Sequence, residues 1–343
     1  GQHALHLRPN GTVWAFGDNG AGQLGDGTTS GRSTAVQVGG ISTAISVAAG
    51  GSHSLVLDAG GTVWAFGANN YGQLGDGTNA NRTSPVQVGG LSKIVAIAAG
   101  EGHSLALRND GVVFAWGRNS YGQLGDGTTS HRNAPVQALG LSDITSITAG
   151  QLHSFATRAD GVAFAFGGNG YGNLCDGSFQ DRPTPVQLPL VGVAGIASGF
   201  HHTLFLRGNG TVYGCGANYS GQLGDGTTNG RTAILQVSGV SNILQIFAGA
   251  SHSLLRRSDG AVLAFGSNGS GQLGDGTNAD KTTAVVIGGL GSAAAVSAGA
   301  NYSLVLRPNA NVYSFGTNWS GQLGVGSFNA GSNTPQLVTP SWP

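Results

Sequence analysis

The sequence predicts an all-β fold, a seven-bladed β-propeller with four antiparallel strands in each blade. Three observations predict it. The stretch Gly-Gln-Leu-Gly-Asp-Gly at residues 72–77 recurs every 50 residues, with one step of 49. Each period holds four strand-like runs, and no run has helical periodicity. A period of roughly 20 to 50 residues is typical of solenoids, propellers and arrays.

Seven copies of this stretch divide the chain. Five are complete and two are degenerate; they occupy residues 22–27, 72–77, 122–127, 172–177, 221–226, 271–276 and 321–326. No linker or change in composition separates them, which predicts one domain. The expected repeats are 1–50, 51–100, 101–150, 151–199, 200–249, 250–299 and 300–343.

The strand order within a repeat unit follows from residues 94–138, and we name the strands A to D from the propeller axis outwards. Residues 94–99 are apolar throughout, which predicts a strand A buried on both faces. Residues 103–107 alternate as strand B, and an Asp-Gly turn joins them to strand C at 112–116. Residues 135–138 form the shortest strand, D, whose proline suits a sheet edge.

This meander places the A–B turns and C–D loops on one face of the disc, which we call the loop face. The B–C turns and D–A links lie on the other. Gly1 aligns with Gly51, so the first blade has strands B, C and D without strand A. We expect the missing inner strand upstream of Gly1 in the natural polypeptide, because residues 339–343 contain two prolines and cannot supply it.

Composition excludes several classes of partner. The 343 residues carry 15 acidic and 15 basic side chains, so the net charge is zero and no basic surface for nucleic acid is expected. No apolar run approaches the roughly 18 residues of a membrane span, so we expect no membrane insertion. The chain has neither a signal peptide nor an initial Met, which favours a processing site or an excerpt boundary at Gly1.

The two cysteines occupy non-equivalent positions. Cys215 stands where other repeats have Phe66, Trp116 or Phe265, so we expect it to be a small core residue. Cys175 replaces a loop glycine. A disulfide between them is the alternative, since the sequence does not place their Cβ atoms.

An acidic and a basic residue recur together, six positions apart, in each C–D loop but the last. The pairs are Asp26 and Arg32, Asp76 and Arg82, Asp126 and Arg132, Asp176 and Arg182, Asp225 and Arg231, and Asp275 and Lys281. In the seventh repeat both change, to Val325 and Gly331. Their joint loss indicates a charge-assisted hydrogen bond that fastens the loop. The alternative, a calcium site, needs more oxygen ligands than one carboxylate per loop supplies.

A histidine opens strand B in six repeats, at His3, His53, His103, His153, His202 and His252, and Tyr302 takes the place in the seventh. Neighbouring blades would hold these side chains too far apart for zinc, so we expect no metal and instead buried histidines bonded to backbone groups. The serine that follows points to the other side of the strand, which argues against a catalytic dyad.

Aromatic and polar side chains of the loop face are the candidate partner-binding residues. They are Tyr71, Tyr121, Tyr171, Tyr219, Trp319, Glu101, Phe200 and His201, with Phe179 and Phe328 further along the same loops. Aromatic anchors on a rim favour a protein partner or a sugar. The alternative is that they pack on the adjacent loop.

No motif predicts catalysis or a cofactor. Residues 20–25 and 269–274 spell a dinucleotide fingerprint but lack the helix and the later acidic residue that the fingerprint needs. No nucleophile elbow or Walker loop occurs. For an enzyme with a lyase or hydrolase site at the mouth of the central channel, the nominated residues would be Glu101, His201 and Arg118.

The order Gly-x-x-His-Ser-Leu, Asp-Gly-x-Val, Trp-Gly-x-Asn, Gly-Gln-Leu-Gly-Asp-Gly-Thr, Arg, Pro-Val, most complete in residues 101–136, resembles the regulator of chromosome condensation repeat. The resemblance implies a seven-bladed propeller. It also implies possible roles that range from guanine-nucleotide exchange on a small GTPase to modules of ubiquitin ligases and a bacterial propeller that binds β-lactamase. Equal repeat lengths leave no room for the inserted wedge that the exchange activity uses.

We therefore expect a bacterial-type member, secreted or on the cell surface, that acts as a monomeric, non-catalytic binding or scaffold propeller. Its partner would be another protein or neighbouring domains of a longer polypeptide. The alternatives are an enzyme with a site at the channel mouth and an exchange factor for a small GTPase.

Overall fold

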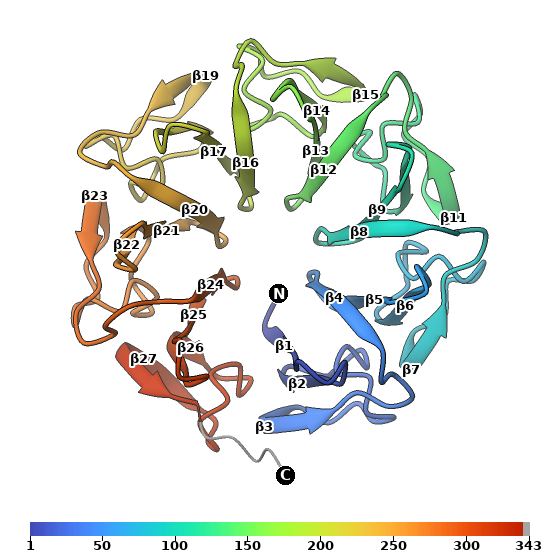
Figure 1. The fold of residues 1–343 in the computed structure, drawn as a ribbon, viewed down its shortest axis with the longest axis horizontal. Coiled ribbons are helices and arrows are strands. Elements are labelled where there is room, and N and C mark those ends of the chain that lie inside the picture. Colours follow the sequence, from blue (N-terminus) through green and yellow to red (C-terminus); the bar gives the residue numbers. More distant parts are fainter. Residues whose placement is uncertain (339–343) are drawn as a thin grey trace.

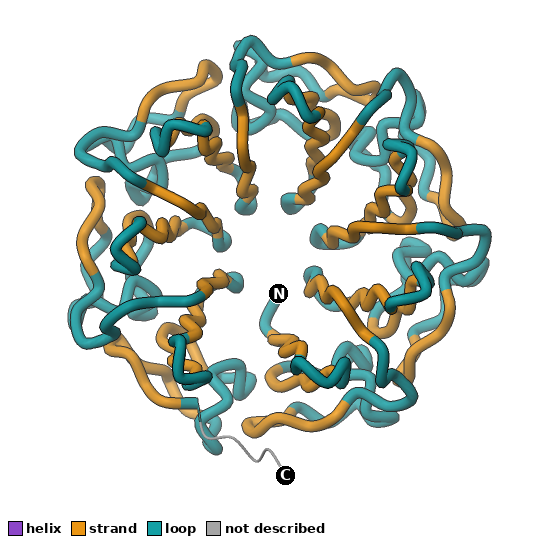
Figure 2. The backbone as a smooth tube through the Cα atoms, viewed as in Figure 1, coloured by secondary structure: helices purple, strands orange, loops and turns teal. Residues whose placement is uncertain are grey.

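Seven β-sheets surround a central axis in the computed structural model, which describes residues 1–338 (Figure 1). The described chain consists of strands and loops, without a helix (Figure 2). The predicted seven-bladed, all-β propeller is confirmed. The prediction that residues 339–343 cannot form an inner strand lies outside the described residues.

The blades follow one another around the ring. The first holds β1 (His3–Leu7), β2 (Val13–Gly17) and β3 (Arg32–Gln37). The second holds β4 (Ala44–Ala49), β5 (His53–Asp58), β6 (Val63–Gly67) and β7 (Arg82–Gln87). The third holds β8 (Ile94–Ala99), β9 (His103–Arg108), β10 (Val113–Gly117) and β11 (Arg132–Gln137). The fourth holds β12 (Ile144–Ala149), β13 (His153–Arg158), β14 (Ala163–Gly167) and β15 (Arg182–Gln187).

The remaining blades repeat this order. The fifth holds β16 (Val193–Ser198), β17 (His202–Arg207), β18 (Val212–Gly216) and β19 (Arg231–Gln236). The sixth holds β20 (Ile243–Ala248), β21 (His252–Arg257), β22 (Val262–Gly266) and β23 (Lys281–Val286). The seventh holds β24 (Ala295–Ala298), β25 (Tyr302–Leu306), β26 (Val312–Asn318) and β27 (Asn329–Leu337).

Every blade is an antiparallel meander, and the outermost strand is longer than the sequence suggested. In the third blade β10 pairs with β11 from Phe114↔Gln137 to Gly117↔Arg132, across a bulge. The bulge lets pairing continue beyond the proline, so the prediction of a short strand D starting at Pro135 is wrong.

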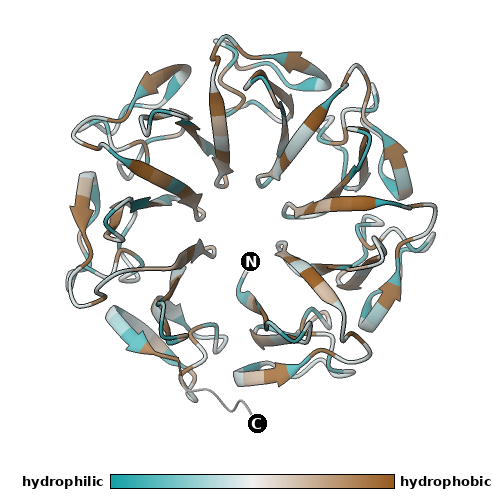
Figure 3. Ribbon diagram, in the orientation of Figure 1, coloured by the Kyte–Doolittle hydropathy of each residue, from teal (hydrophilic) through white to brown (hydrophobic). Residues whose placement is uncertain are grey.

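The inner strands are buried on one face only. Val95 of β8 is 53% exposed, whereas Ile94 beside it is buried. The prediction of burial on both faces is therefore wrong. The exposed side chains stand second in their strands, at Ile45, Val95 and Leu244, and the cavity at the channel mouth is lined by Ala99 at the other end of β8. Apolar residues colour much of each inner strand in Figure 3 although these side chains are exposed.

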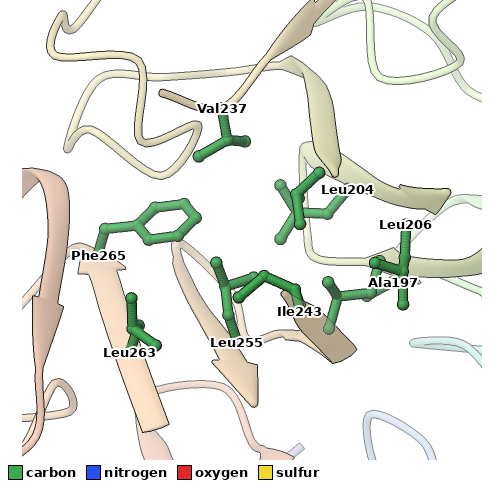
Figure 4. Close-up of a cluster of buried hydrophobic side chains, with 10 residues drawn as sticks. Ala197, Leu204, Leu206, Val237, Ile243, Leu255, Leu263 and Phe265 are labelled. Atoms are coloured by element: carbon green, nitrogen blue, oxygen red, sulfur yellow. The ribbon is translucent and has the colours of Figure 1, made fainter. Parts of the chain in front are cut away.

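The hydrophobic core lies between the blades. In the cluster of Figure 4, Leu204 and Leu206 of β17 in the fifth blade meet Leu255, Leu263 and Phe265 of the sixth. A loop glycine makes the closest approach, because a Cβ atom on Gly224 would lie 2.9 Å from the ring of Phe265. The same fit joins Gly75 to Trp116 and Gly125 to Phe166. Six of the seven C–D loops thus pack with a glycine against an aromatic ring of the next blade.

The junction between the fourth and fifth blades is an exception. Cys175 occupies the glycine position, Cys215 occupies the aromatic position, and the two form a disulfide with a Cα–Cα distance of 5.6 Å. The expectation that Cys215 is an unbonded core residue is wrong. The reason is that the loop of one blade reaches the third strand of the next, so residues 40 apart in sequence are neighbours in space.

The ring closes between the seventh and first blades. Tyr302 Oη donates a hydrogen bond to the His3 carbonyl at 2.6 Å, and the Gly326 amide donates to the Ser33 carbonyl at 2.8 Å. The first blade has three strands, as predicted, with β1 nearest the axis. A cavity of about 200 Å³, lined by Leu5, Val47 and Leu304 among others, lies beside β1.

Candidate functional site

Each C–D loop is organised around one buried asparagine. In the third blade Asn119 Oδ1 accepts the Leu124 amide at 3.0 Å, which fixes the start of the Gly-rich turn. Its Nδ2 donates to Asp126 Oδ1 and to the carbonyls of Thr128 and Ser130, each at 3.1 Å. Sequence reasoning singled out the aspartate and overlooked this asparagine. Its recurrence in all seven repeats, at Asn19, Asn69, Asn119, Asn169, Asn218, Asn268 and Asn318, was the available signal.

The recurrent acidic and basic residues meet in every loop that contains both. In the third blade Asp126 Oδ2 accepts hydrogen bonds from Arg132, while its Oδ1 accepts the amide and hydroxyl of Thr128. The nitrogen–oxygen distances of the six ion pairs are 2.7 Å for Arg32–Asp26, 2.7 Å for Arg82–Asp76, 2.8 Å for Arg132–Asp126, 2.7 Å for Arg182–Asp176, 3.1 Å for Arg231–Asp225 and 3.2 Å for Lys281–Asp275.

The loop carboxylates stay ionised to low pH. Burial raises the pKa of Asp126, but the hydrogen bonds from Thr128, Arg132 and Asn119 outweigh it, and the pKa lies below its usual value. In the seventh loop, which lacks the pair, Asn318 Nδ2 donates to Asn329 Oδ1 at 3.0 Å. A neutral side chain there takes one of the roles that the carboxylate fills elsewhere.

The Asp126→Ala substitution should lower the free energy of unfolding by about 2–3 kcal/mol, because it leaves the Thr128 N–H without its acceptor and removes one of the acceptors of Asn119 Nδ2. Adding Arg132→Ala should lower it little further, since the half-exposed guanidinium has already lost its partner. Urea denaturation of both single variants and the double variant measures the coupling. Strictly additive losses would contradict a joint role.

The strand B histidines bond across blades. His53 Nε2 lies 2.9 Å from Ser104 Oγ of the next blade, and Ser104 Oγ donates to the Gln73 carbonyl at 2.8 Å. Because the Ser104 hydroxyl donates its proton to Gln73, its oxygen must accept the bond from His53. Nε2 therefore carries the proton of the neutral His53 imidazole. The expectation of a backbone partner is wrong, because the same-strand serine faces away while the serine of the next blade faces the ring.

The same link recurs around the ring. It joins His3 to Ser54, His103 to Ser154, His202 to Ser253, His252 to Ser303 and, at 3.4 Å, His153 to Thr203. Burial lowers the pKa of His53, His103, His153 and His202 to about 3. Within residues 1–338 no group of three or more His, Cys, Asp or Glu side chains could hold a metal ion.

The loop-face aromatics fall into two kinds that the sequence analysis treated as one. Tyr71, Tyr121 and Tyr171 directly precede the loop glycine and lie against the next blade. Tyr219 and Trp319 come one residue earlier and project into solvent, 73% and 69% exposed. This one-residue offset, visible in the sequence, separates the most exposed rings from partly covered ones, since Tyr121 and Tyr171 are 38% and 42% exposed.

Side chains of the next blade cover two of the inward tyrosines. The Arg118 guanidinium lies 5.2 Å from the ring centroid of Tyr71, and Arg118 Nη1 is 3.6 Å from Glu101 Oε2. His201 stacks on Tyr171 with the ring centroids 4.1 Å apart, and Phe200 packs edge-on against His201. Tyr121 instead borders a pocket of about 360 Å³ whose lining also includes Tyr171, Phe179 and His201.

The sequence matches a known family profile over more than half of its length. The profile described as the RCC1-like domain matches residues 1–194, more than half of the chain. The chain belongs to the RCC1-like family. Profiles of the regulator of chromosome condensation (RCC1) repeat match residues 193–222, 243–272, 209–255 and 259–306 of the same RCC1-like chain.

Solved structures share this fold. Prp20p from Saccharomyces cerevisiae, described with binding properties to Gsp1p and histones, is 22% identical, with a TM-score of 0.87 over 98% of this chain and 88% of that one. Human WBSCR16 is also 22% identical, with a TM-score of 0.87 over 96% of this chain and 95% of that one. A search of curated proteins gave no match. At this identity the likeness shows the fold of the RCC1-like chain and not its partner.

Of the three residues nominated for an enzyme site, Glu101 and Arg118 meet in this RCC1-like propeller, and His201 does not join them at the channel mouth. A cavity of about 190 Å³ at the channel mouth is lined mainly by glycine and alanine, and Glu101 is the one acidic side chain among its described lining residues. Arg118 neutralises Glu101, and His201 lies outside this lining, stacked on Tyr171. No helix in the described chain is long and apolar enough to cross a membrane.

Proposed function

We propose that this RCC1-like propeller is a non-catalytic protein-binding module that presents its loop face to a partner protein. The observation that carries the proposal is the distribution of exposed aromatic rings. Within residues 1–338 the exposed Phe, Tyr and Trp side chains all belong to C–D loops: Tyr121, Tyr171, Phe179, Tyr219, Trp319 and Phe328. Aromatic side chains at a rim are common anchors of protein interfaces.

The geometry of the loops supports this role. The asparagine network recurs in all seven loops and an acidic–basic pair in six, and these bonds limit loop motion, so little conformational entropy is lost when a partner binds. Glu101, Phe200 and His201 lie on the same face and extend it toward the axis. We also propose that this face can seat a neighbouring domain of a longer polypeptide, and that the propeller itself is monomeric.

The double substitution Tyr219→Ala/Trp319→Ala tests the face, because both side chains project into solvent and their loss should not disturb folding. Capture of the partner from extracts of the natural host should fall at least about tenfold, since interface aromatics commonly contribute about 2 kcal/mol each. The matched control is Val95→Ala/Val191→Ala, which alters exposed apolar side chains at the start of an inner strand and in a D–A link, at the end of the blades away from the A–B turns. Equal capture by both variants would refute the proposal.

Small GTPases and histones are the first partners to test, because Prp20p is described with binding to Gsp1p and histones. A nucleotide-release assay with a small GTPase distinguishes the exchange-factor alternative from simple binding. The assignment to a bacterial branch, secreted or on the cell surface, stays a prediction.

A further inference from the structure

A pocket opens on the loop face where the third, fourth and fifth blades meet. Its volume is about 360 Å³. Aromatic rings form much of its wall, among them Tyr121, Tyr171 and Phe179, and Asp181 supplies a carboxylate at the rim. Gly168 lies on its lining next to Tyr121 and contributes no side chain.

The preceding repeat contains an equivalent tyrosine, Tyr71, whose ring is covered by an arginine. There the ring of Tyr71 carries the guanidinium of Arg118 at 5.2 Å from its centroid. The carboxylate of Glu101 lies 3.6 Å from Arg118 Nη1. A tyrosine face and a carboxylate together hold a planar cation, which is the arrangement that cation–π and charge-assisted contacts favour.

The 50-residue period carries the tyrosine onto the pocket but not the carboxylate, because Glu101 corresponds to Gln151 and the pocket's own carboxylate, Asp181, corresponds to His131. Tyr71 corresponds to Tyr121, and Arg118 corresponds to Gly168. A Cβ atom built on Gly168 would lie 3.4 Å from Tyr121 Cβ, so a side chain at this position would start beside the tyrosine. The pocket therefore includes the space that the chain fills with its own arginine one repeat earlier.

The charges around the pocket suit a cation. Burial lowers the pKa of His201, which lines the wall, and that of His153 falls to about 3, so both imidazoles are neutral near pH 7. The Asp181 carboxylate accepts the Asn169 amide at 2.8 Å through Oδ1. No Lys or Arg side chain is among the described lining residues.

We propose that this pocket binds the guanidinium group of an arginine side chain on a partner protein, with the Tyr121 ring beneath it and Asp181 as its counter-ion. The inference rests on the proposed function, because it names the chemistry by which the loop face would read its partner. The arginine would occupy the place that Arg118 takes over Tyr71.

The direct test is isothermal titration with the peptide acetyl-Gly-Gly-Arg-Gly-Gly-amide. The control is the same peptide with citrulline, which keeps the shape of the side chain and removes the charge. One equivalent of the arginine peptide should bind, and the citrulline peptide should bind at least about tenfold more weakly. Equal binding of the two peptides would overturn the proposal.

Three variants place the binding in the pocket. Gly168→Arg should fill it as Arg118 fills the preceding site and abolish binding. Arg118→Gly should open the Tyr71 site and raise the stoichiometry toward two. Asp181→Asn should weaken binding about tenfold and leave the loop intact, because Asn81 accepts the equivalent amide in the second blade at 2.8 Å.

If Gly168→Arg does not fold, Tyr121→Leu serves in its place and should reduce binding by about tenfold. Unchanged binding of the arginine peptide to folded Gly168→Arg or folded Tyr121→Leu would contradict the proposal. The failure of the proposed function looks different. If partner capture is lost with Tyr219→Ala/Trp319→Ala but unchanged with Gly168→Arg, the loop face binds the partner and the pocket does not contribute. If the pocket binds the arginine peptide but Tyr219→Ala/Trp319→Ala leaves partner capture unchanged, the pocket proposal is supported and the proposed function is contradicted.

Discussion

The double variant Cys175→Gly/Cys215→Phe will fold with nearly native stability, although each single substitution will destabilise the propeller by about 3 kcal/mol or more. The double variant restores the glycine and aromatic pair that seats the loop at other junctions, as Gly224 and Phe265 do. Loss of a cross-link that spans 40 residues costs about 4 kcal/mol in the chain-entropy description. Burial of a phenyl ring, at about 2–3 kcal/mol, and relief of a left-handed residue offset most of that loss.

The single variants lack this compensation. Cys175→Gly removes the cross-link and leaves the small Cys215 side chain under the loop, where a ring belongs. Cys215→Phe brings a ring against the Cys175 side chain, and Cys175 has a φ of 63° that fixes where its Cβ points. Urea denaturation of the four proteins, with and without reductant, closes the cycle. A double variant no more stable than the worse single variant would contradict the predicted exchange.

Acidification will unfold the propeller between about pH 6 and pH 4.5, well before the loop carboxylates protonate. Six histidines are buried at the blade junctions: His3, His53, His103, His153, His202 and His252. Burial holds the pKa of His53 near 3 and that of His252 near 4, against 6.5 in the unfolded chain. Below pH 6.5 the unfolded chain therefore binds protons that the folded chain does not. The free energy of unfolding decreases as the pH is lowered.

The expected slope is large. Each histidine contributes about 1.4 kcal/mol per pH unit once the pH is well below 6.5, so the six together give about 8 kcal/mol per pH unit. The loop aspartates act in the same direction, because their pKa values are lowered on folding, but only below about pH 4. The pH dependence of the urea midpoint measures the slope.

The His103→Gln substitution is the matched control for this pH dependence. Its amide can donate to Ser154 Oγ as the imidazole does, and it does not titrate. The proton uptake on unfolding near pH 5 should fall by about one. Tyr302 shows that the position accepts another hydrogen-bond donor. Stability that stays constant from pH 7 to pH 5 would show that these histidines are protonated in the folded ring.

The repeat period was enough to predict the propeller and the blade without its inner strand, because equivalent positions must adopt equivalent structures. It was not enough to predict contacts between blades. Ser104 and Ser54 are equivalent by period, yet only the three-dimensional offset between blades shows that His53 bonds to Ser104. The Cys175–Cys215 disulfide was only the alternative interpretation of the sequence for the same reason. The sequence shows that Cys175 and Cys215 both depart from the repeat, but it does not show that the two side chains face each other.

The candidate site was less predictable than the fold. Aromatic residues in the C–D loops pointed to the loop face, but their exposure depends on a one-residue offset that separates Tyr219 from Tyr171. The pocket beside Tyr121 depends on a missing side chain, at Gly168. In a chain with 63 glycines a single glycine carries no signal until its neighbours are placed in space.

The blade-to-blade contact has a geometric consequence. At five of the seven junctions one blade offers a loop glycine and a histidine and the next blade offers a ring and a hydroxyl, so the contact is head-to-tail rather than self-complementary. Repeated head-to-tail contacts form either an endless helix or a closed circle, depending only on the rotation at each step. The bonds from Tyr302 to His3 and from Gly326 to Ser33 show that the rotation closes after seven blades. The contact between neighbouring blades, which the residues of each repeat determine, therefore sets the number of blades.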